Sequence, residues 1–134
     1  MPTMATVDFG PFARERGVRL LLQFGSTVTG RVHAGSDVDL AVMLDRPPAS
    51  LLEYGELAAD LQALLPDREV DLAVLNHADP LLLKQVVDGC RLLYGDPRAL
   101  SELRIYAFKR YQDHRRFLAM ERDYVRRKVA AASR

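Results

Sequence analysis

The chain has 134 residues, of which 49% are hydrophobic and 28% charged, and its formal net charge is +1. This composition excludes a fibrous, low-complexity or intrinsically disordered protein, and the length suits one hydrophobic core. The longest apolar run, residues 40–44, is far shorter than the roughly twenty residues of a membrane span. With one cysteine and no apolar leader, we expect one cytoplasmic domain over residues 1–134, with a core at about 18–95 and a helical extension at about 97–132.

Strands and helices alternate along the predicted core. Four segments have the apolar or alternating pattern of buried strands: residues 18–24, 37–44, 69–75 and 91–94. A capping box at Ser50 and Glu53 begins a helix that ends at Pro66. Asp79 and Pro80 supply the N-cap and first turn of another helix, which ends before Gly89. The pattern predicts an α/β (α+β) fold with a small sheet.

The segment after Asp96 and Pro97 is predicted to be one long or broken helix, and it is basic. Residues 1–100 carry 9 basic and 14 acidic side chains, a net charge of −5, whereas residues 101–134 carry 10 and 4, a net charge of +6. Three interpretations of this basic helix stay open: a solvated face, a docking surface for an acidic partner, or a contact with RNA. Its tyrosines are interpreted as packing residues: Tyr106, Tyr111 and Tyr124.

Carboxylates at the start of two predicted strands are candidates for a metal site. Asp37 and Asp39 are two residues apart, so on a strand they share one face, with Cα atoms roughly 6.6 Å apart. If strand 69–75 lies beside strand 37–44, Asp71 joins them, and Glu69 is the second choice for the third carboxylate. Oxygen ligands of this kind favour a hard cation such as Mg²⁺, and two ions fit such a cluster. The structural alternative is that Asp37 caps the strand and Asp39 pairs with an arginine.

A glycine and a serine follow the first predicted strand. Gly25 and Ser26 begin a turn whose backbone N–H groups and hydroxyl could face a phosphate. A Walker A loop is excluded, because Arg31 and Val32 stand where that motif requires Lys and Ser or Thr.

The combination of these motifs resembles the polymerase-β-like nucleotidyltransferases. It consists of Gly25-Ser26, the Asp37-Val38-Asp39 triplet ten residues later, and Val70-Asp71-Leu72. The segment GSTVTGRVHAGSDVDLAVML and the short chain look most like the minimal nucleotidyltransferases (MNT), antitoxins that partner HEPN ribonuclease toxins. The resemblance implies the fold of that superfamily, with a small mixed sheet flanked by helices.

The resemblance also implies a reaction and a role for each matching residue. AMP would pass from ATP to a hydroxyl, in this subfamily a tyrosine of the HEPN toxin, and pyrophosphate would leave. Gly25 and Ser26 would hold phosphates, Asp37 and Asp39 would bind both Mg²⁺ ions, and Asp71 would hold the catalytic ion and help to deprotonate the acceptor. Many relatives carry an arginine earlier, where this chain has residues 27–29. Arg31 could reach the triphosphate in its place, and the alternative is a solvated arginine in the loop. Ser36 would support the metal ligands.

Three other functions remain as alternatives. A nucleotidyltransferase acting on a small molecule such as an aminoglycoside needs further sequence for its acceptor. A catalytically silent antitoxin would neutralise a toxin by covering it, and substitution of all three aspartates would leave neutralisation unchanged. An RNA-binding module would use the basic helix, although no direct contact with nucleic acid is expected for the leading function. We expect a heteromeric complex with a HEPN-type toxin, and a homodimer stays open.

Overall fold

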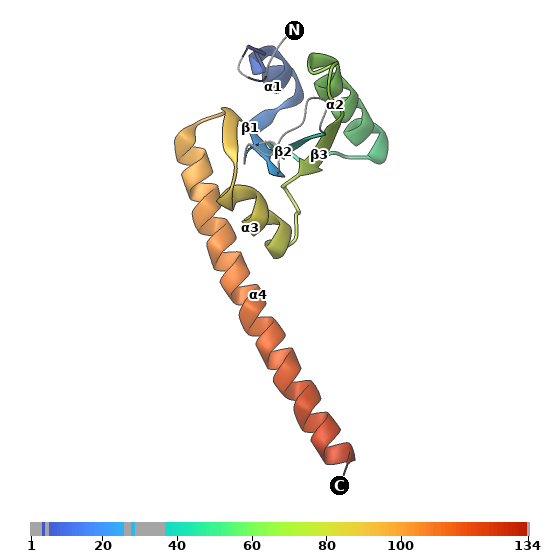
Figure 1. Ribbon diagram of the computed structural model, residues 1–134, viewed down its shortest axis with the longest axis vertical. Helices are drawn as coiled ribbons and strands as arrows, with labels where there is room; N and C mark the ends of the chain where they lie inside the picture. Colours follow the sequence, from blue (N-terminus) through green and yellow to red (C-terminus); the bar gives the residue numbers. More distant parts are fainter. Residues whose placement is uncertain (1–3, 5, 26–27, 29–36, 134) are drawn as a thin grey trace.

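The computed structural model describes residues 4, 6–25, 28 and 37–133. Its elements, in chain order, are α1 (Gly10–Arg16), β1 (Val18–Phe24), β2 (Val38–Leu44), α2 (Leu51–Leu64), β3 (Val70–Val74), α3 (Pro80–Asp88), β4 (Arg91–Tyr94) and α4 (Pro97–Ala132). The strands form a sheet in the order β3-β2-β1-β4. The sheet is mixed, because β1 is antiparallel to β2 and β4 whereas β3 is parallel to β2. The predicted mixed sheet with flanking helices and a long C-terminal helix is confirmed (Figure 1).

The predicted helix starts are confirmed by hydrogen bonds at their caps. At α2, Ser50 Oγ accepts from the Glu53 N–H at 3.1 Å, while the Glu53 carboxylate accepts from the Ala49 N–H at 3.1 Å. At α3, Asp79 Oδ1 accepts from the N–H groups of Leu81 and Leu82 at 2.9 and 3.0 Å. These caps satisfy backbone donors that the first turn of a helix leaves unpaired, so they fix where each helix begins.

Helix α1 was not predicted from the sequence, and it extends the core toward the N-terminus. It has only seven residues, fewer than apolar periodicity needs to stand out. Its boundary signals are nevertheless present: Pro11 in the first turn and Gly17 at the C-cap, where φ is +66°. Because Phe12 and Ala13 are buried against the sheet, the core begins before residue 18.

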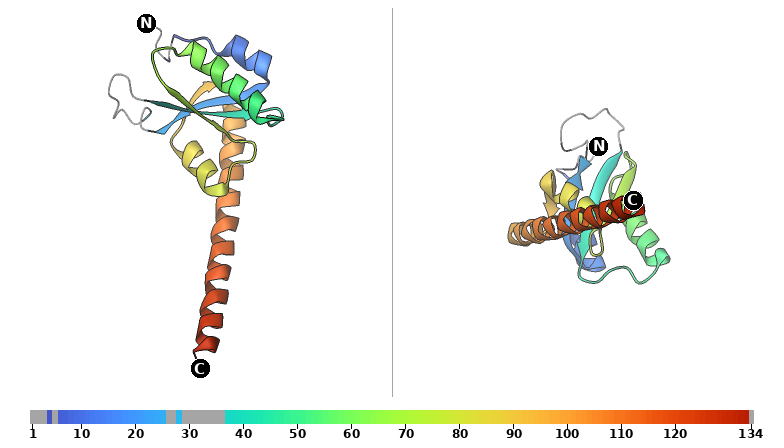
Figure 2. Two further views of the ribbon diagram at one scale, coloured as in Figure 1. Left: turned by 90° about the vertical axis from the view of Figure 1, so that its right-hand side faces the viewer. Right: turned by 90° about the horizontal axis from the view of Figure 1, so that it is seen from below.

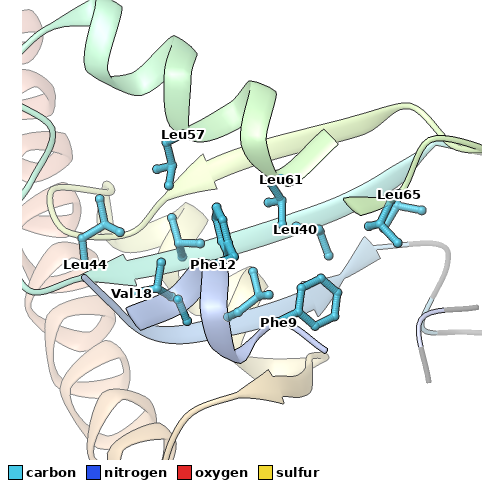
Figure 3. Close-up of a cluster of buried hydrophobic side chains, with 12 residues drawn as sticks. Phe9, Phe12, Val18, Leu40, Leu44, Leu57, Leu61 and Leu65 are labelled. Carbon is cyan, nitrogen blue, oxygen red and sulfur yellow. The ribbon is translucent and has the colours of Figure 1, made fainter. Parts of the chain in front are cut away.

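Two apolar clusters cover the two faces of the sheet. On one face, α1 and α2 bury side chains of β1 and β2, and Figure 3 shows Leu57 and Leu61 of α2 pointing toward the sheet, with Leu61 next to Leu40. On the other face, α3 and the first part of α4 pack against side chains that include Leu22 and Ala41. Figure 2 shows the sheet between these two helical layers. Alternate residues of each strand therefore belong to opposite cores.

Polar side chains fasten β3 to its neighbours. Asn76 mimics a strand residue: its Oδ1 accepts from the Leu44 N–H at 3.0 Å, and its Nδ2 donates to the Leu44 carbonyl at 2.8 Å. The Tyr54 hydroxyl of α2 donates to the carbonyl of Leu72 at 2.8 Å. The Tyr54 bond satisfies a carbonyl of the edge strand β3. The Asn76 bonds join the segment just after β3 to the end of β2 and so hold the two strands in register.

Helix α4 is continuous for 36 residues, about 54 Å at the usual rise. Its buried side chains, Leu100, Leu103 and Ala107, all lie in its first third, and the rest projects beyond the sheet (Figures 1 and 2). The interpretation of its tyrosines as packing residues is wrong for Tyr106 and Tyr124, which are 51% and 57% exposed. Among the described residues, no helix combines the length and apolarity that crossing a membrane requires.

Candidate functional site

The predicted site residues meet where β1 ends and where β2 and β3 begin. Gly25 directly follows β1, Asp37 directly precedes β2, and Asp71 is the second residue of β3. In the antiparallel pair, Phe24 is opposite Asp39, and in the parallel pair Asp39 is opposite Asp71. The predicted condition that the strand carrying Asp71 lies beside the strand carrying Asp39 is therefore met.

Asp39 and Asp71 lie on the same face of the sheet. In β2, Val38 and Leu40 belong to the core under α1 and α2, whereas Ala41 belongs to the core under α3 and α4. Because side chains alternate along a strand, Asp39 shares the α3 and α4 face with Ala41. The parallel register places Asp71 beside it on the same face. Asp39 is half-buried, whereas Asp37 and Asp71 are exposed.

Gly25 is a glycine for two separate reasons. Its φ is +79°, a left-handed conformation that other residues adopt at a cost. A Cβ placed on Gly25 would lie 2.2 Å from Oδ2 of Asp39, which is closer than two unbonded atoms can approach. The backbone after β1 consequently passes directly against the Asp39 carboxylate. The Val28 N–H then donates to the Gly25 carbonyl at 3.2 Å, so the chain turns here.

The electrostatics of Asp39 show why this edge of the sheet favours a cation. Burial raises the pKa of Asp39, and the nearby negative charges of Asp71 and then Asp37 raise it further. Each cause raises the free energy of the ionised Asp39 carboxylate. A divalent cation bound beside Asp37, Asp39 and Asp71 would instead stabilise the ionised form of all three carboxylates. The donors are oxygen atoms only, which suits Mg²⁺. Within the described residues, no three acidic, histidine or cysteine side chains already enclose a common point for an ion.

A hydrogen-bonded turn before β3 fixes the position of Asp71 along the strand direction relative to β2. The Gln62 side chain of α2 donates to the carbonyls of Leu65 and Arg68 at 2.9 and 2.5 Å and accepts from the Val70 N–H at 2.9 Å. The Val38 N–H also donates to the Glu69 carbonyl at 2.8 Å. Glu69 thus pairs with β2 through its backbone, and the carboxylates that act on Asp39 are those of Asp71 and Asp37.

Three of the predicted phosphate-binding or supporting residues cannot be placed. Ser26, Arg31 and Ser36 lie outside the described residues. Sequence reasoning, in turn, missed Gln62. Its position near the end of a predicted helix gave no sign that its amide would bind the turn before β3.

A separate cleft of about 590 Å³ lies at the opposite ends of these strands, where β1 begins and β2 ends. Basic and acidic side chains alternate around it: Arg14, Glu15, Arg16, Asp45, Arg46 and Glu53. The Arg16 guanidinium is already engaged by Asp60 of α2. The formal charges of these side chains sum to zero, and the cleft contains none of the predicted site residues.

Comparison with known proteins identifies the family of the chain. The family model described as polymerase beta, nucleotidyltransferase matches residues 11–99, a range that contains nearly all of α1 and all four strands of the sheet. Two curated relatives are both described as protein adenylyltransferase MntA. The one from Aphanizomenon flos-aquae is 30% identical over 89 residues, 60% of this chain and 59% of the relative. The one from Shewanella oneidensis is 36% identical over 78 residues, 58% and 55% of the two chains. The chain thus spans less than two thirds of these relatives.

Solved structures resemble almost the whole chain. A toxin–antitoxin crystal structure with AMP-PNP matches with a TM-score of 0.68 and 29% identity, covering 90% of this chain and 94% of the other. A chain from the complex of a tri-AMPylated Shewanella oneidensis HEPN toxin with its MNT antitoxin matches with a TM-score of 0.62 and 26% identity, covering 90% and 91%. The similarity therefore extends beyond the sheet into α4.

The raised pKa of Asp39 predicts how stability changes with pH in metal-free buffer. Because the folded-state pKa lies above the unfolded one, the folded state binds more protons between the two values, and stability falls as pH rises through that window. At neutral pH the full penalty is present, so Asp39→Asn should unfold at a higher temperature than the wild type. The difference should shrink as pH falls toward the unfolded-state pKa. Thermal unfolding in EDTA between pH 4 and 8 measures both effects.

The control for this experiment is Asp123→Asn on the exposed part of α4, which should leave the unfolding temperature unchanged across the same pH range. An Asp39→Asn protein that is less stable than the wild type at neutral pH would show that the carboxylate is stabilised by a partner instead.

The contact of Gly25 with Asp39 predicts a non-additive pair of substitutions. Gly25→Ala should destabilise the fold by about 1–2 kcal/mol through its backbone conformation alone, and further through the collision. Asp39→Ala removes the colliding oxygen, so Gly25→Ala should cost less in that background. Urea unfolding of the four proteins gives the coupling free energy.

Gly55→Ala is the matched control, because Gly55 lies in α2 with open space around it. It should stabilise the protein by about 0.5–1 kcal/mol. Equal costs of Gly25→Ala in both backgrounds would contradict the contact.

Proposed function

Because the chain belongs to the polymerase beta nucleotidyltransferase family, we propose that it transfers AMP from ATP to a hydroxyl group of another protein. The observation that carries this proposal is the strand register, which brings Gly25, Asp39 and Asp71 to one edge of the sheet. A glycine turn beside two neighbouring carboxylates is suited to binding a nucleoside triphosphate together with its divalent cations.

We assign the metal ligands to Asp37, Asp39 and Asp71. Two Mg²⁺ ions held there would neutralise the charge that develops on the phosphates during transfer. The turn that begins at Gly25, with Ser26 and Arg31, would receive the triphosphate, and Ser36 would support the ligands. This assignment is supported by the raised pKa of Asp39, whose burial and acidic neighbours make a cation favourable.

The reaction exchanges one phosphorus–oxygen bond for another. The acceptor hydroxyl oxygen bonds to the α-phosphorus, the bond from that phosphorus to the bridging oxygen breaks, and pyrophosphate leaves. Asp71, exposed at the start of β3, would take the proton from the hydroxyl. Asp39, half-buried and held between the Gly25 turn and Asp71, provides a fixed ligand. Catalysis is then mainly the positioning of reactants and the neutralisation of charge.

The acceptor we propose is a tyrosine of a HEPN-type ribonuclease toxin, which this protein would inactivate as an antitoxin. Both curated relatives are described as protein adenylyltransferases. One similar structure contains an AMPylated HEPN toxin with its MNT antitoxin, and another contains AMP-PNP. With ATP as donor, we place the reaction in the cytoplasm.

Labelled ATP tests this function directly. The wild-type protein, Mg²⁺ and ATP labelled at the α-phosphate are incubated with a purified HEPN-type toxin from the same source. We expect label on the toxin, and Asp39→Asn or Asp71→Asn should reduce the rate by about 100-fold or more, since each removes charge stabilisation from the transition state. Asp45→Asn, directly after the far end of β2, should retain the wild-type rate.

The remaining outcomes identify the alternatives. An unlabelled toxin that is still neutralised by the triple aspartate variant would indicate a catalytically silent antitoxin. Label on a small molecule such as an aminoglycoside, with none on protein, would indicate the other class of nucleotidyltransferase.

A further inference from the structure

The end of α4 is a surface that the rest of the described chain leaves uncovered. We call residues 115–132 distal α4; every side chain in it is exposed. It is about 27 Å long at the usual helical rise. Figures 1 and 2 show it projecting away from the sheet and from α3. Its exposed large apolar side chains include Phe117, Leu118, Met120, Tyr124, Val125 and Val129.

The apolar stripe of distal α4 continues the buried face of the same helix. Spacings of three, four and four residues keep side chains on one line of a nearly straight helix. The line runs through buried side chains first and exposed ones later: Leu100, Leu103, Ala107, Tyr111, His114, Leu118, Arg122, Val125 and Val129. Leu118, Val125 and Val129 are 42%, 55% and 62% exposed. The helix therefore presents to solvent the kind of face that it buries against its own core, which is typical of a protein-binding surface.

The charge of distal α4 indicates the chemistry of its partner. The segment carries six basic side chains and two acidic ones, a net charge of +4. Arg122 lies on this line, and Arg115 and Arg126 lie beside it. Within the described chain no carboxylate lies within ion-pair distance of these three arginines. A second copy of this helix would bring like charges together, whereas an apolar groove with an acidic rim would complement both features.

The position of distal α4 relates it to the carboxylates. Asp39 and Asp71 lie on the face of the sheet that α3 and α4 cover. The left view in Figure 2 shows α4 extending from that side of the sheet. A protein held by distal α4 is thus on the same side of the sheet as the site of transfer.

We propose that distal α4 is the docking surface for the acceptor protein, which contributes an apolar groove rimmed by Asp and Glu. The stripe of Leu118, Val125 and Val129 fills the groove, and the flanking arginines pair with its rim. This proposal rests on the proposed function, because it concerns how the acceptor of AMP is held.

Two pairs of substitutions test the docking surface, and a third pair is the control. Leu118→Ser with Val125→Ser removes much of the apolar stripe, and Ala119→Ser with Ala130→Ser introduces two serines on a different face of the helix. The probe is the purified HEPN-type toxin, and its affinity is measured by isothermal titration calorimetry. The stripe pair should weaken binding by about 10-fold or more, and the control pair should not. Arg122→Glu with Arg126→Glu should weaken binding and flatten its dependence on salt.

Transfer kinetics separate this proposal from the proposed function. The stripe pair should raise the KM for the toxin while affinity for a non-hydrolysable ATP analogue stays at the wild-type value. Unchanged affinity and unchanged KM would overturn the docking surface even if label is transferred. Binding that depends on the stripe, without any transfer by the wild type, would support docking while contradicting the proposed activity. Circular dichroism and the unfolding temperature show whether each variant folds.

Two further results would overturn the proposal by naming another occupant. A wild-type dimer in sedimentation that the stripe pair converts to a monomer would assign distal α4 to a second copy. Binding of labelled RNA that the arginine pair abolishes and the stripe pair leaves intact, with toxin affinity unchanged, would assign it to nucleic acid.

Discussion

A half-buried carboxylate with two acidic neighbours is the constraint on which the site depends. Asp39 is held against the Gly25 backbone on one side and beside Asp71 on the other. Burial and like charge both oppose its ionisation, so the fold keeps in place a group that weakens it at neutral pH. Such strain at one position is common at functional sites, where the rest of the structure holds it.

The two apolar cores and a few side-chain hydrogen bonds around β3 hold Asp39 and its acidic neighbours in place. Leucines from β1, β2 and α2 are almost fully buried on both sides of the sheet. The Gln62 side chain binds the Val70 N–H at the start of β3, and the Asn76 side chain, just after β3, binds the backbone of Leu44 at the end of β2. Both therefore oppose sliding of β3 relative to β2. A slip of one residue would move Asp71 to the opposite face. These amides therefore stabilise the same register that brings the carboxylates together.

The sequence predicted much of the fold, because its boundary signals are local. The bounds of β1 and β4 and the caps of α2 and α3 follow from turn residues and apolar runs. The short helix α1 was not predicted, because seven residues are too few to show a helical period. The pairing of Asp39 with Asp71 could be stated only as a condition, because strand order is not local. Apolar periodicity also could not show that the apolar stripe of α4 is buried only as far as Ala107. A helix face that packs on the core and a helix face that binds a partner have the same apolar pattern.

The central claim is that the carboxylates at this edge of the sheet bind divalent cations together with a nucleotide. Electron paramagnetic resonance of Mn²⁺, titrated into the protein with a non-hydrolysable ATP analogue, measures this without any acceptor. We predict saturable binding by the wild type that Asp39→Asn weakens by about 10-fold or more. Equal Mn²⁺ affinity in both proteins would contradict the assignment of Asp39 as a ligand, and with it the account of why the fold retains a buried negative charge.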